Sequence, residues 1–207
     1  MIVSIARELG AGGRTVGEAV AAAIGAALLD ERAIITELSA RAGYAPEFLA
    51  ERLERPPTTG DRLIADLAAS SAMMWFVAPA EQPDEIIINT VREIVTEHAA
   101  RGHVVVIGHG GRSLLGWRPA GVPVLAILLH ASRAWRIEQL ARRYGIDAQE
   151  ARRRVDRTDD ARARYQRHYF NTDLYDSRQY DLVLSAESLG LPLTIEIATL
   201  AATSVAS

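Results

Sequence analysis

The sequence lacks both lysine and cysteine. All 23 basic residues of the 207-residue chain are arginine, and the abundance of alanine beside them points to genomic base composition as the cause. The missing lysine excludes a Schiff-base lysine, a lysine base and a lysine-bearing phosphate loop. The missing cysteine excludes disulfides, thiolate zinc sites and cysteine nucleophiles. Any phosphate that this protein binds must therefore be held by arginine, by backbone amides or by a metal ion.

Long hydrophobic runs and a strong net charge are missing as well. Apolar runs such as residues 122–129, which contain a proline, are short, whereas a membrane span needs about 20 residues. The first residues lack the basic region and the apolar core of a secretory signal, so we expect a cytoplasmic protein with no membrane partner. The net charge of −3 gives no whole-chain argument for nucleic-acid binding.

The charge is unevenly distributed along the chain. Residues 131–170 hold 11 arginines against 6 acidic residues, whereas the rest holds 12 arginines against 20 acidic residues. A basic region on an acidic protein indicates a local anionic ligand rather than a polyanion track.

The hydrophobic pattern predicts strands that alternate with helices. The strands are expected at 2–6, 27–30, 103–107, 122–129 and 180–185. The helices are expected at 15–24, 31–42, 46–55, 61–76, 84–101, 131–144, 147–157, 158–170 and 191–202. Nearly continuous apolar strands separated by helices indicate an α/β fold with a parallel sheet covered on both faces. In such sheets ligands bind at the carboxyl ends of the strands.

A glycine-rich turn follows the first predicted strand and precedes a helix. Glycines in that place let backbone N–H groups converge on an anion at a helix N-terminus. Against the phosphate-loop pattern G-x-x-x-x-G-K-S/T, Gly12 matches the second glycine, but Arg7 stands at the first glycine and Gly13 at the lysine. A glycine turn without a ligand stays the alternative for this segment.

The residues around this turn resemble the opening of the cytidylate-kinase-like family. Its members begin with a strand and S-R-E-F/Y-G-S/A-G-G-R/K, and residues 4–14 are similar to that run. Against the cytidylate kinase loop G-x-x-G-A-G-K-G-T, Gly10-Ala11-Gly12 matches G-A-G and Thr15 matches the threonine. Other marks of the family recur in order, at Asp30-Glu31-Arg32, 104–111, His130-Ala131-Ser132 with Arg136, 159–165 and 180–184.

The resemblance implies a three-layer P-loop nucleoside monophosphate kinase fold, with a helical acceptor-binding insertion and an arginine-rich helical lid. The expected single domain covers 1–207, with a core at 1–30, 102–132 and 178–203, the insertion at about 31–101 and the lid at about 133–170. The implied reaction transfers a phosphoryl group from ATP to CMP or dCMP with Mg²⁺. Small-molecule nucleotides are then the partners.

The resemblance also implies a donor-binding loop. Its members are Gly10, Ala11, Gly12, Gly13, Arg14 and Thr15. The loop amides would hold the donor phosphate, and the Thr15 hydroxyl would be a ligand of Mg²⁺. Arg14 would supply the cation that lysine usually brings. The alternative for Arg14 is a surface arginine in the first helical turn.

In the lid, the alignment selects Arg136, Asp159 and Arg162 as catalytic groups, and Asp159 and Arg162 as contacts of the acceptor. Arg157 is a candidate by charge and position alone. We expect most other arginines there to form a solvated face with acidic partners, as Arg154 would with Glu150.

On the acceptor side, His109 stands where the family has an arginine that binds the acceptor phosphate. A histidine serves that role only when it is protonated, or else Arg112 substitutes for it. Asp30 is a candidate for Mg²⁺, a base edge or a ribose hydroxyl, and we favour a helix cap.

The aromatic residues Tyr44, Trp75 and Phe76 either stack on a base or pack in the core, and core packing is favoured. The run Met73-Met74-Trp75-Phe76 is long enough for an interface patch, which leaves a homodimer open. Two alternatives to a nucleotide kinase remain. One is a regulatory nucleotide-binding module with little or no transfer activity, and the other is a P-loop kinase for a different small acceptor.

Overall fold

A five-stranded parallel sheet forms the centre of the molecule. The computed structural model describes residues 1–54, 83–115 and 121–206. The strand order is β2-β3-β1-β4-β5, and Ile2 of β1 pairs with both Val104 and Val124. The strands are β1 (Ile2–Arg7), β2 (Ala27–Leu29), β3 (Val104–Ile107), β4 (Val124–His130) and β5 (Leu182–Ser185). Each strand lies within or next to a predicted range, and the apolar runs of β1, β3 and β4 are buried on both faces, whereas the edge strands β2 and β5 are partly exposed.

Helices cover both faces of the sheet. Val3 and Ile5 pack with α1 (Gly13–Ile24) and α9 (Ala186–Ala206). Ile2, on the opposite face, packs in a cluster with residues of α2, α3 and α5. These helices are α2 (Glu31–Ala42), α3 (Pro46–Glu54) and α5 (Pro83–Arg101). The alternation of strand side chains therefore builds one apolar core on each face.

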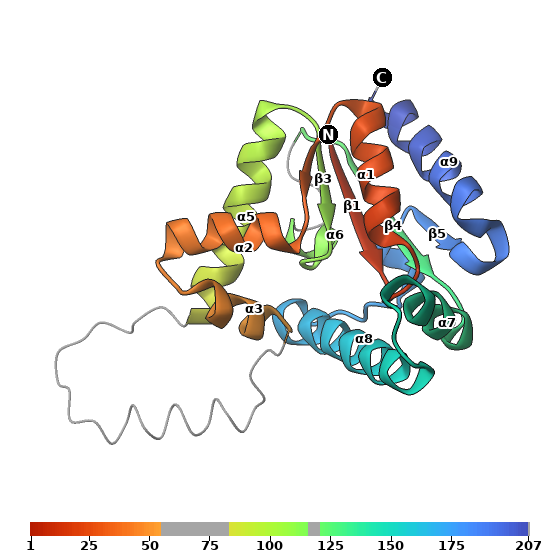
Figure 1. Cartoon of the computed structure of the whole chain (residues 1–207). Helices are drawn as coiled ribbons and strands as arrows, with labels where there is room; N and C mark the ends of the chain where they lie inside the picture. Colours follow the sequence, from red (N-terminus) through yellow and green to blue (C-terminus); the bar gives the residue numbers. More distant parts are fainter. Residues whose placement is uncertain (55–82, 116–120, 207) are drawn as a thin grey trace, which may run out of the picture.

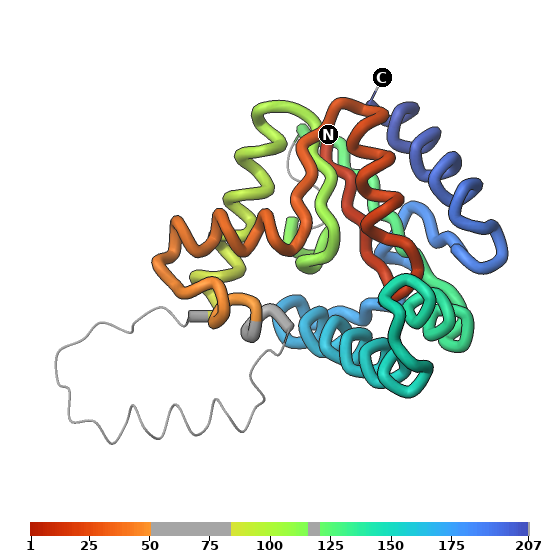
Figure 2. The backbone as a smooth tube through the Cα atoms, viewed as in Figure 1, coloured from red at the N-terminus to blue at the C-terminus, as the bar shows by residue number. Residues whose placement is uncertain are grey.

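Two further helices lie at the carboxyl ends of the strands. They are α7 (Arg133–Tyr144) and α8 (Ala148–Phe170), and α8 runs across the strand ends at the bottom of the view (Figure 1). Two short elements complete the described chain, α6 (Gly111–Leu114) and a 3-10 turn at Ser177–Gln179. The ends of β1 and β3 both point toward α8 (Figure 2). The carboxyl ends of the strands are thus covered in part by α7 and α8 (Figure 1).

Three helix predictions need comment. The predicted separation of 147–157 from 158–170 is wrong, because neither glycine nor proline interrupts the run and α8 is continuous. The last helix begins at Ala186 rather than 191, with a break at Gly190 (φ 72°) ahead of Pro192. The predicted helix 61–76, with Met73, Met74, Trp75 and Phe76, lies outside the described residues, so these predictions and the homodimer stay open.

The helix α9 is long and apolar enough, by length and composition, to cross a membrane. Its mean hydropathy is 1.5 over the most apolar window, of which 17% is buried. Its buried side packs on α1, β4 and β5. The expected absence of a membrane partner stays a prediction.

Candidate functional site

A cavity of about 780 Å³ opens at the carboxyl ends of the strands. The loop after β1 and the start of α1 form one wall, the start of α2 another, and α7 a third. The strand order explains its position, because β1 lies between β3 and β4 and its loop emerges at the centre of the sheet edge.

The glycine loop presents backbone donors to this cavity. Gly10 (φ 91°) and Gly12 (φ 82°) adopt left-handed conformations that favour glycine. The first bond of α1 runs from the Val16 N–H to the Gly12 carbonyl at 3.0 Å. The N–H groups of Gly13, Arg14 and Thr15 therefore have no partner within the helix. Three converging amides at a helix N-terminus can hold an anion such as a phosphate.

The same loop is closely packed at Gly10 and Gly12, where other residues occupy the place of a side chain. A Cβ atom on Gly10 would lie 2.8 Å from the carbonyl oxygen of Arg136. A Cβ atom on Gly12 would lie 2.6 Å from Leu191 Cδ1. A backbone cradle with glycines at these places fits the phosphates of ATP, and its binding role stays a prediction.

A buried ionic cluster holds the first part of the loop. Arg136 is 5% exposed and forms ion pairs with Glu8 at 3.2 Å and with Asp159. It also donates to the carbonyl oxygens of Leu9 and Ala131 at 3.1 and 3.0 Å. Asp159 accepts from the Leu9 N–H at 2.8 Å. The structure thus brings together Arg136 and Asp159, both predicted to be catalytic, beneath the loop, where they position it. Contact with a substrate stays a prediction for both.

Arg14 lies at the outer edge of the cavity. Its side chain is 61% exposed and pairs with Glu18 at 2.8 Å and Asp30 at 3.5 Å. The hydrogen bond to Glu18 and the charge of Asp30 raise the pKa of Arg14. Two carboxylates therefore already balance the guanidinium that was predicted to replace the loop lysine. Its catalytic role stays a prediction.

Arg7, at the end of β1, lies in the cavity wall and was not among the predicted site residues. Its aliphatic stem packs over Gly13, where a Cβ atom would lie 2.6 Å from Arg7 Cγ. Arg162, which was predicted, donates from Nη1 to the Arg7 carbonyl oxygen at 3.2 Å. The available sequence signal was an arginine in place of the first glycine of the phosphate-loop pattern.

His109 lies in the turn after β3 in a left-handed conformation (φ 55°). Burial, and next the positive charges of Arg7 and Arg162, lower the pKa of His109 to about 3. The imidazole is therefore neutral near pH 7, and it cannot supply the positive charge of the arginine that the family has there. Its place in acceptor binding stays a prediction.

We expect acid to destabilise the protein through His109. In the unfolded chain this group takes up a proton near its ordinary pKa of about 6.5, whereas in the folded chain it does so only near 3. The free energy of unfolding therefore keeps its full value while the pH is above the pKa of His109 in the unfolded chain. It decreases as the pH falls from there toward the pKa of His109 in the folded chain. The variant His109→Asn should show a flatter decline in urea-unfolding free energy between pH 7 and pH 4, because asparagine tolerates positive φ. Parallel declines for both proteins would contradict the shifted pKa.

Arg112, three residues after His109, forms hydrogen bonds with the segment that precedes β5. It donates to the Gln179 carbonyl at 3.3 Å and to Asp181 at 3.2 Å, so it ties α6 to the segment before β5. Arg112 also lines a small cavity of about 50 Å³ beside His109 and Arg162. The structure thus groups three of the predicted acceptor residues, His109, Arg112 and Arg162, around one small cavity.

Asp30 caps α2, as the sequence analysis favoured. Its carboxylate accepts from the Ala33 N–H at 2.9 Å. Asp30 also lines the large cavity, so its predicted contact with the substrate stays open.

We expect Asp30→Ala to lower the free energy of unfolding by about 1 kcal/mol, the usual value of an N-cap. Asp30→Asn keeps a side-chain acceptor and should lose less than half of that amount. Thermal and urea unfolding of both variants measure the difference. Equal losses for alanine and asparagine would show that charge, and not capping, sets the effect.

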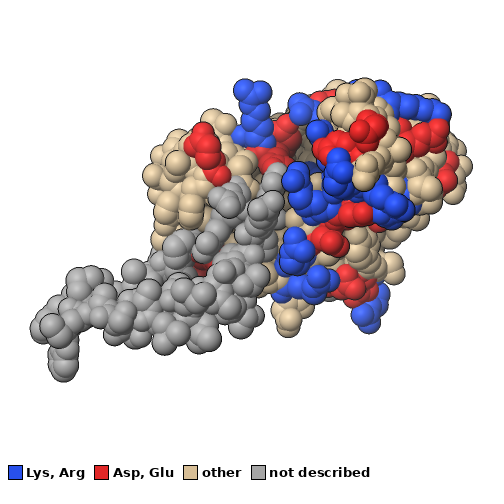
Figure 3. All heavy atoms as spheres, turned by 60° about the horizontal axis from the view of Figure 1, so that its bottom comes forward, with Lys and Arg blue, Asp and Glu red and all other residues tan. Residues whose placement is uncertain are grey.

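The other arginines of α7 and α8 form a mixed surface. Figure 3 shows these arginines interleaved with acidic side chains on the face that α8 covers. The predicted pair of Arg154 with Glu150 is present at 2.7 Å, and Arg133 pairs with Asp156. Arg157 is exposed, and its predicted role stays open. Four of these arginines, Arg133, Arg142, Arg153 and Arg154, therefore pair with acidic residues of the same two helices.

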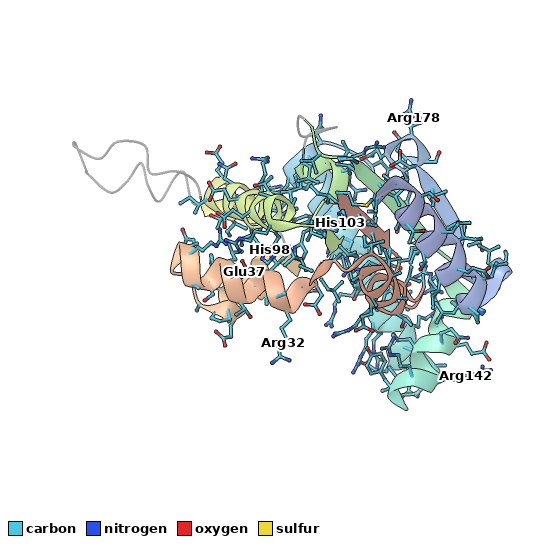
Figure 4. All side chains as sticks on the ribbon, turned by 90° about the horizontal axis from the view of Figure 1, so that it is seen from above. Arg32, Glu37, His98, His103, Arg142 and Arg178 are labelled. Atoms are coloured by element: carbon cyan, nitrogen blue, oxygen red, sulfur yellow. The ribbon has the colours of Figure 1, made fainter. Side chains whose placement is uncertain are left out.

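Two pairs of side chains, one polar and one aromatic, lie outside the large cavity. Glu37 on α2 and His98 on α5 point toward one another at 2.8 Å (Figure 4). Tyr44 packs in the core cluster of α2 and α5 and against Phe48, with ring centroids 5.3 Å apart, as core packing predicts. These contacts join the helices that cover one face of the sheet, and they do not indicate a ligand site.

The described part of the chain contains no group of three or more histidine, aspartate or glutamate side chains that could hold a metal ion. Thr15 lines the large cavity, and its hydroxyl fits the predicted single protein ligand of Mg²⁺. Mg²⁺ commonly takes its other ligands from substrate phosphates and water.

The solved structures similar to this chain show the fold. An uncharacterized protein from Eubacterium ventriosum is 18% identical with a TM-score of 0.67, and the match covers 99% of this chain and 98% of that one. TT1252 from Thermus thermophilus is 18% identical with a TM-score of 0.53, covering 99% and 96%. A sugar kinase from Janibacter sp. is 14% identical with a TM-score of 0.51, covering 99% and 94%.

The predicted three-layer P-loop kinase fold is thus confirmed, while the domain bounds stay predictions. No curated protein matches the sequence. A family model described as the cytidylate kinase-like family matches residues 2–188, and the chain belongs to this family.

Proposed function

We propose that the protein is a cytoplasmic, ATP-dependent phosphotransferase that acts on a nucleoside monophosphate, with CMP or dCMP as the acceptor. The observation that carries this proposal is the glycine loop, whose three open amides at the start of α1 face a cavity of about 780 Å³. Membership of the cytidylate kinase-like family supports it.

The residues around the loop have the properties that phosphoryl transfer needs. Transfer depends on positioning and on neutralising charge rather than on a covalent nucleophile. The loop amides would bind the donor phosphates, and Thr15 would hold Mg²⁺, which neutralises phosphate charge when bound. Arg162 would neutralise charge from the opposite wall, where it lines both cavities. The cluster of Arg136, Glu8 and Asp159 would hold the loop in place.

A coupled ADP-release assay with ATP and a panel of nucleoside monophosphates tests the proposal. We expect the highest kcat/KM with CMP or dCMP and little turnover with AMP, GMP or water alone. Turnover with a sugar or another small hydroxyl compound, and none with nucleotides, would favour a P-loop kinase for a different acceptor.

The regulatory nucleotide-binding module is the second candidate. The neutral His109 and the missing loop lysine favour it, because both weaken the charge available for transfer. Saturable binding of ATP in calorimetry, with no ADP released from any acceptor, would support the module and exclude the kinase.

A further inference from the structure

Two positions of the phosphate loop have exchanged residue types. The loop pattern has glycine at the position of Arg7 and lysine at the position of Gly13. This chain thus carries a cation where glycine is usual, and glycine where the cation is usual. The sequence does not show whether the side chain of Arg7 reaches the place where a side chain at position 13 would lie. Only the folded chain shows this.

The structure places the Arg7 side chain where a residue at position 13 would extend. A Cβ atom on Gly13 would lie 2.6 Å from Arg7 Cγ and 2.9 Å from Arg7 Cβ. At its other end, the guanidinium of Arg7 fills the space beside Gly108, where a Cβ atom would overlap Nη1. Glycine at both places is therefore what lets Arg7 extend across the end of the sheet.

The charge of Arg7 is not neutralised by a direct partner. Within residues 1–54, 83–115 and 121–206, no carboxylate lies within ion-pair distance of its guanidinium. Burial, followed by the charge of Arg162, lowers the pKa of Arg7 to about 9, while Glu31, Asp30 and Asp159 raise it from a distance. Arg7 thus stays protonated at neutral pH, and an anion beside it would be stabilised.

Arg7 and Arg162 are the two residues that line both cavities described above. One cavity contains the glycine loop, and the other contains His109 and Arg112. A group that moves from a donor on the loop to an acceptor beside His109 would therefore pass these guanidinium groups.

We propose that Arg7 is the catalytic cation of this protein, binding the terminal phosphates of ATP from the space into which a side chain at position 13 would extend. The proposal rests on the phosphotransferase function proposed above. In the transfer step, an anionic phosphate oxygen of the nucleoside monophosphate forms a bond to the γ-phosphorus while the bond from that phosphorus to the β,γ-bridging oxygen breaks. The electron pair of the broken bond stays on ADP. Arg7 neutralises the charge on these oxygens and transfers no proton.

Arg7→Met tests the proposal, because methionine keeps an unbranched stem over Gly13 and removes the charge. We expect kcat to fall by about 100- to 1,000-fold, as for the loss of one preorganised donor. The affinity for ATP in calorimetry should fall by about 10-fold, while the affinity for AMP, which lacks the terminal phosphates, should not change. Arg178→Met is the matched control, because Arg178 lies at the periphery of the molecule (Figure 4), pairs with Asp176 and lines neither cavity.

A reciprocal variant tests the exchange itself. Gly13→Lys alone should lose activity, because its Cβ atom collides with the Arg7 stem. Arg7→Gly/Gly13→Lys removes both close contacts, with Cγ and with Cβ of Arg7, and returns the cation to the usual position, so it should be at least about 10-fold more active than Arg7→Gly. Gly13 does not have positive φ, and the backbone accepts a side chain there. A double variant that folds and is no more active than Arg7→Gly would count against the proposal.

Further outcomes separate this proposal from the proposed function. If the wild-type protein binds ATP but transfers nothing, the phosphotransferase function fails, and the ATP affinities of Arg7→Met and wild type decide the role of Arg7. Unchanged ATP affinity, or kcat within about 3-fold of wild type, would overturn the proposal. A greater loss of activity in Arg14→Met than in Arg7→Met would overturn it as well, and would assign the cation to Arg14.

Circular dichroism of each variant confirms that it is folded. If Arg7→Met unfolds, Arg7→Lys, which keeps the charge, replaces it. Arg7→Lys should keep more activity than Arg7→Ala, and equal losses would overturn the proposal.

Discussion

Arg136→Met should lower the free energy of unfolding by about 3–5 kcal/mol, the range for removing one partner of a buried ion pair. Arg136 is 5% exposed, and its guanidinium neutralises Glu8 and Asp159 while it donates to two loop carbonyls. Methionine fills part of the volume but leaves two carboxylates without their cation. Urea unfolding followed by circular dichroism measures the loss.

Two comparisons make this result specific. Arg136→Met/Asp159→Asn removes one of the two stranded charges, so it should be more stable than the sum of the single variants predicts. Arg142→Met removes an exposed helical ion pair with Glu138 and should cost only about 0.3–0.5 kcal/mol. A loss below about 1 kcal/mol for Arg136→Met would show that the cluster contributes little net stability.

Gly10→Ala should combine a large loss of stability with a large loss of ATP turnover. Alanine at φ 91° is strained, and its Cβ atom would lie 2.8 Å from the carbonyl oxygen of Arg136, which is backbone and cannot turn away. Strain and overlap together should cost about 3 kcal/mol. A shift of the loop amides by about 1 Å should reduce kcat by about 100-fold.

Gly25→Ala is the matched control for this prediction. Gly25 also has positive φ (63°), but no atom lies within 4 Å of the place where its Cβ atom would be. It should therefore cost only the conformational strain of about 1 kcal/mol and leave turnover unchanged. Equal losses of stability in the two variants would show that the packing of the loop on Arg136 is not tight.

Local patterns explain the predictions that the structure confirmed. The strand Val104–Ile107 is apolar throughout, and such a short run between glycines can be buried only in the centre of a sheet. Asp30 was predicted to cap α2 because capping depends on residues within one turn. The break in α8 was wrong for a related reason, since helix ends cannot be placed by composition where neither glycine nor proline marks them.

The roles of the charged groups could not be read from sequence, because charge depends on neighbours that are distant along the chain. Arg136 matched a lid motif, and only the folded chain shows that it is enclosed between Glu8 and Asp159. His109 has an ordinary side chain whose pKa is lowered by burial and by Arg7 and Arg162, which come from two other segments.

The sequence by itself determined the parallel α/β fold, the phosphate-type loop and the absence of lysine, because each of these follows from neighbouring residues or from composition. It also determined that arginine, a backbone amide or a metal must balance any bound phosphate. Only the tertiary structure decided which arginine faces the loop. Arg14 turns to Glu18 and Asp30, whereas Arg7 extends over Gly13 without a carboxylate partner in the described chain, because β1 directs its last side chain across the open end of the sheet.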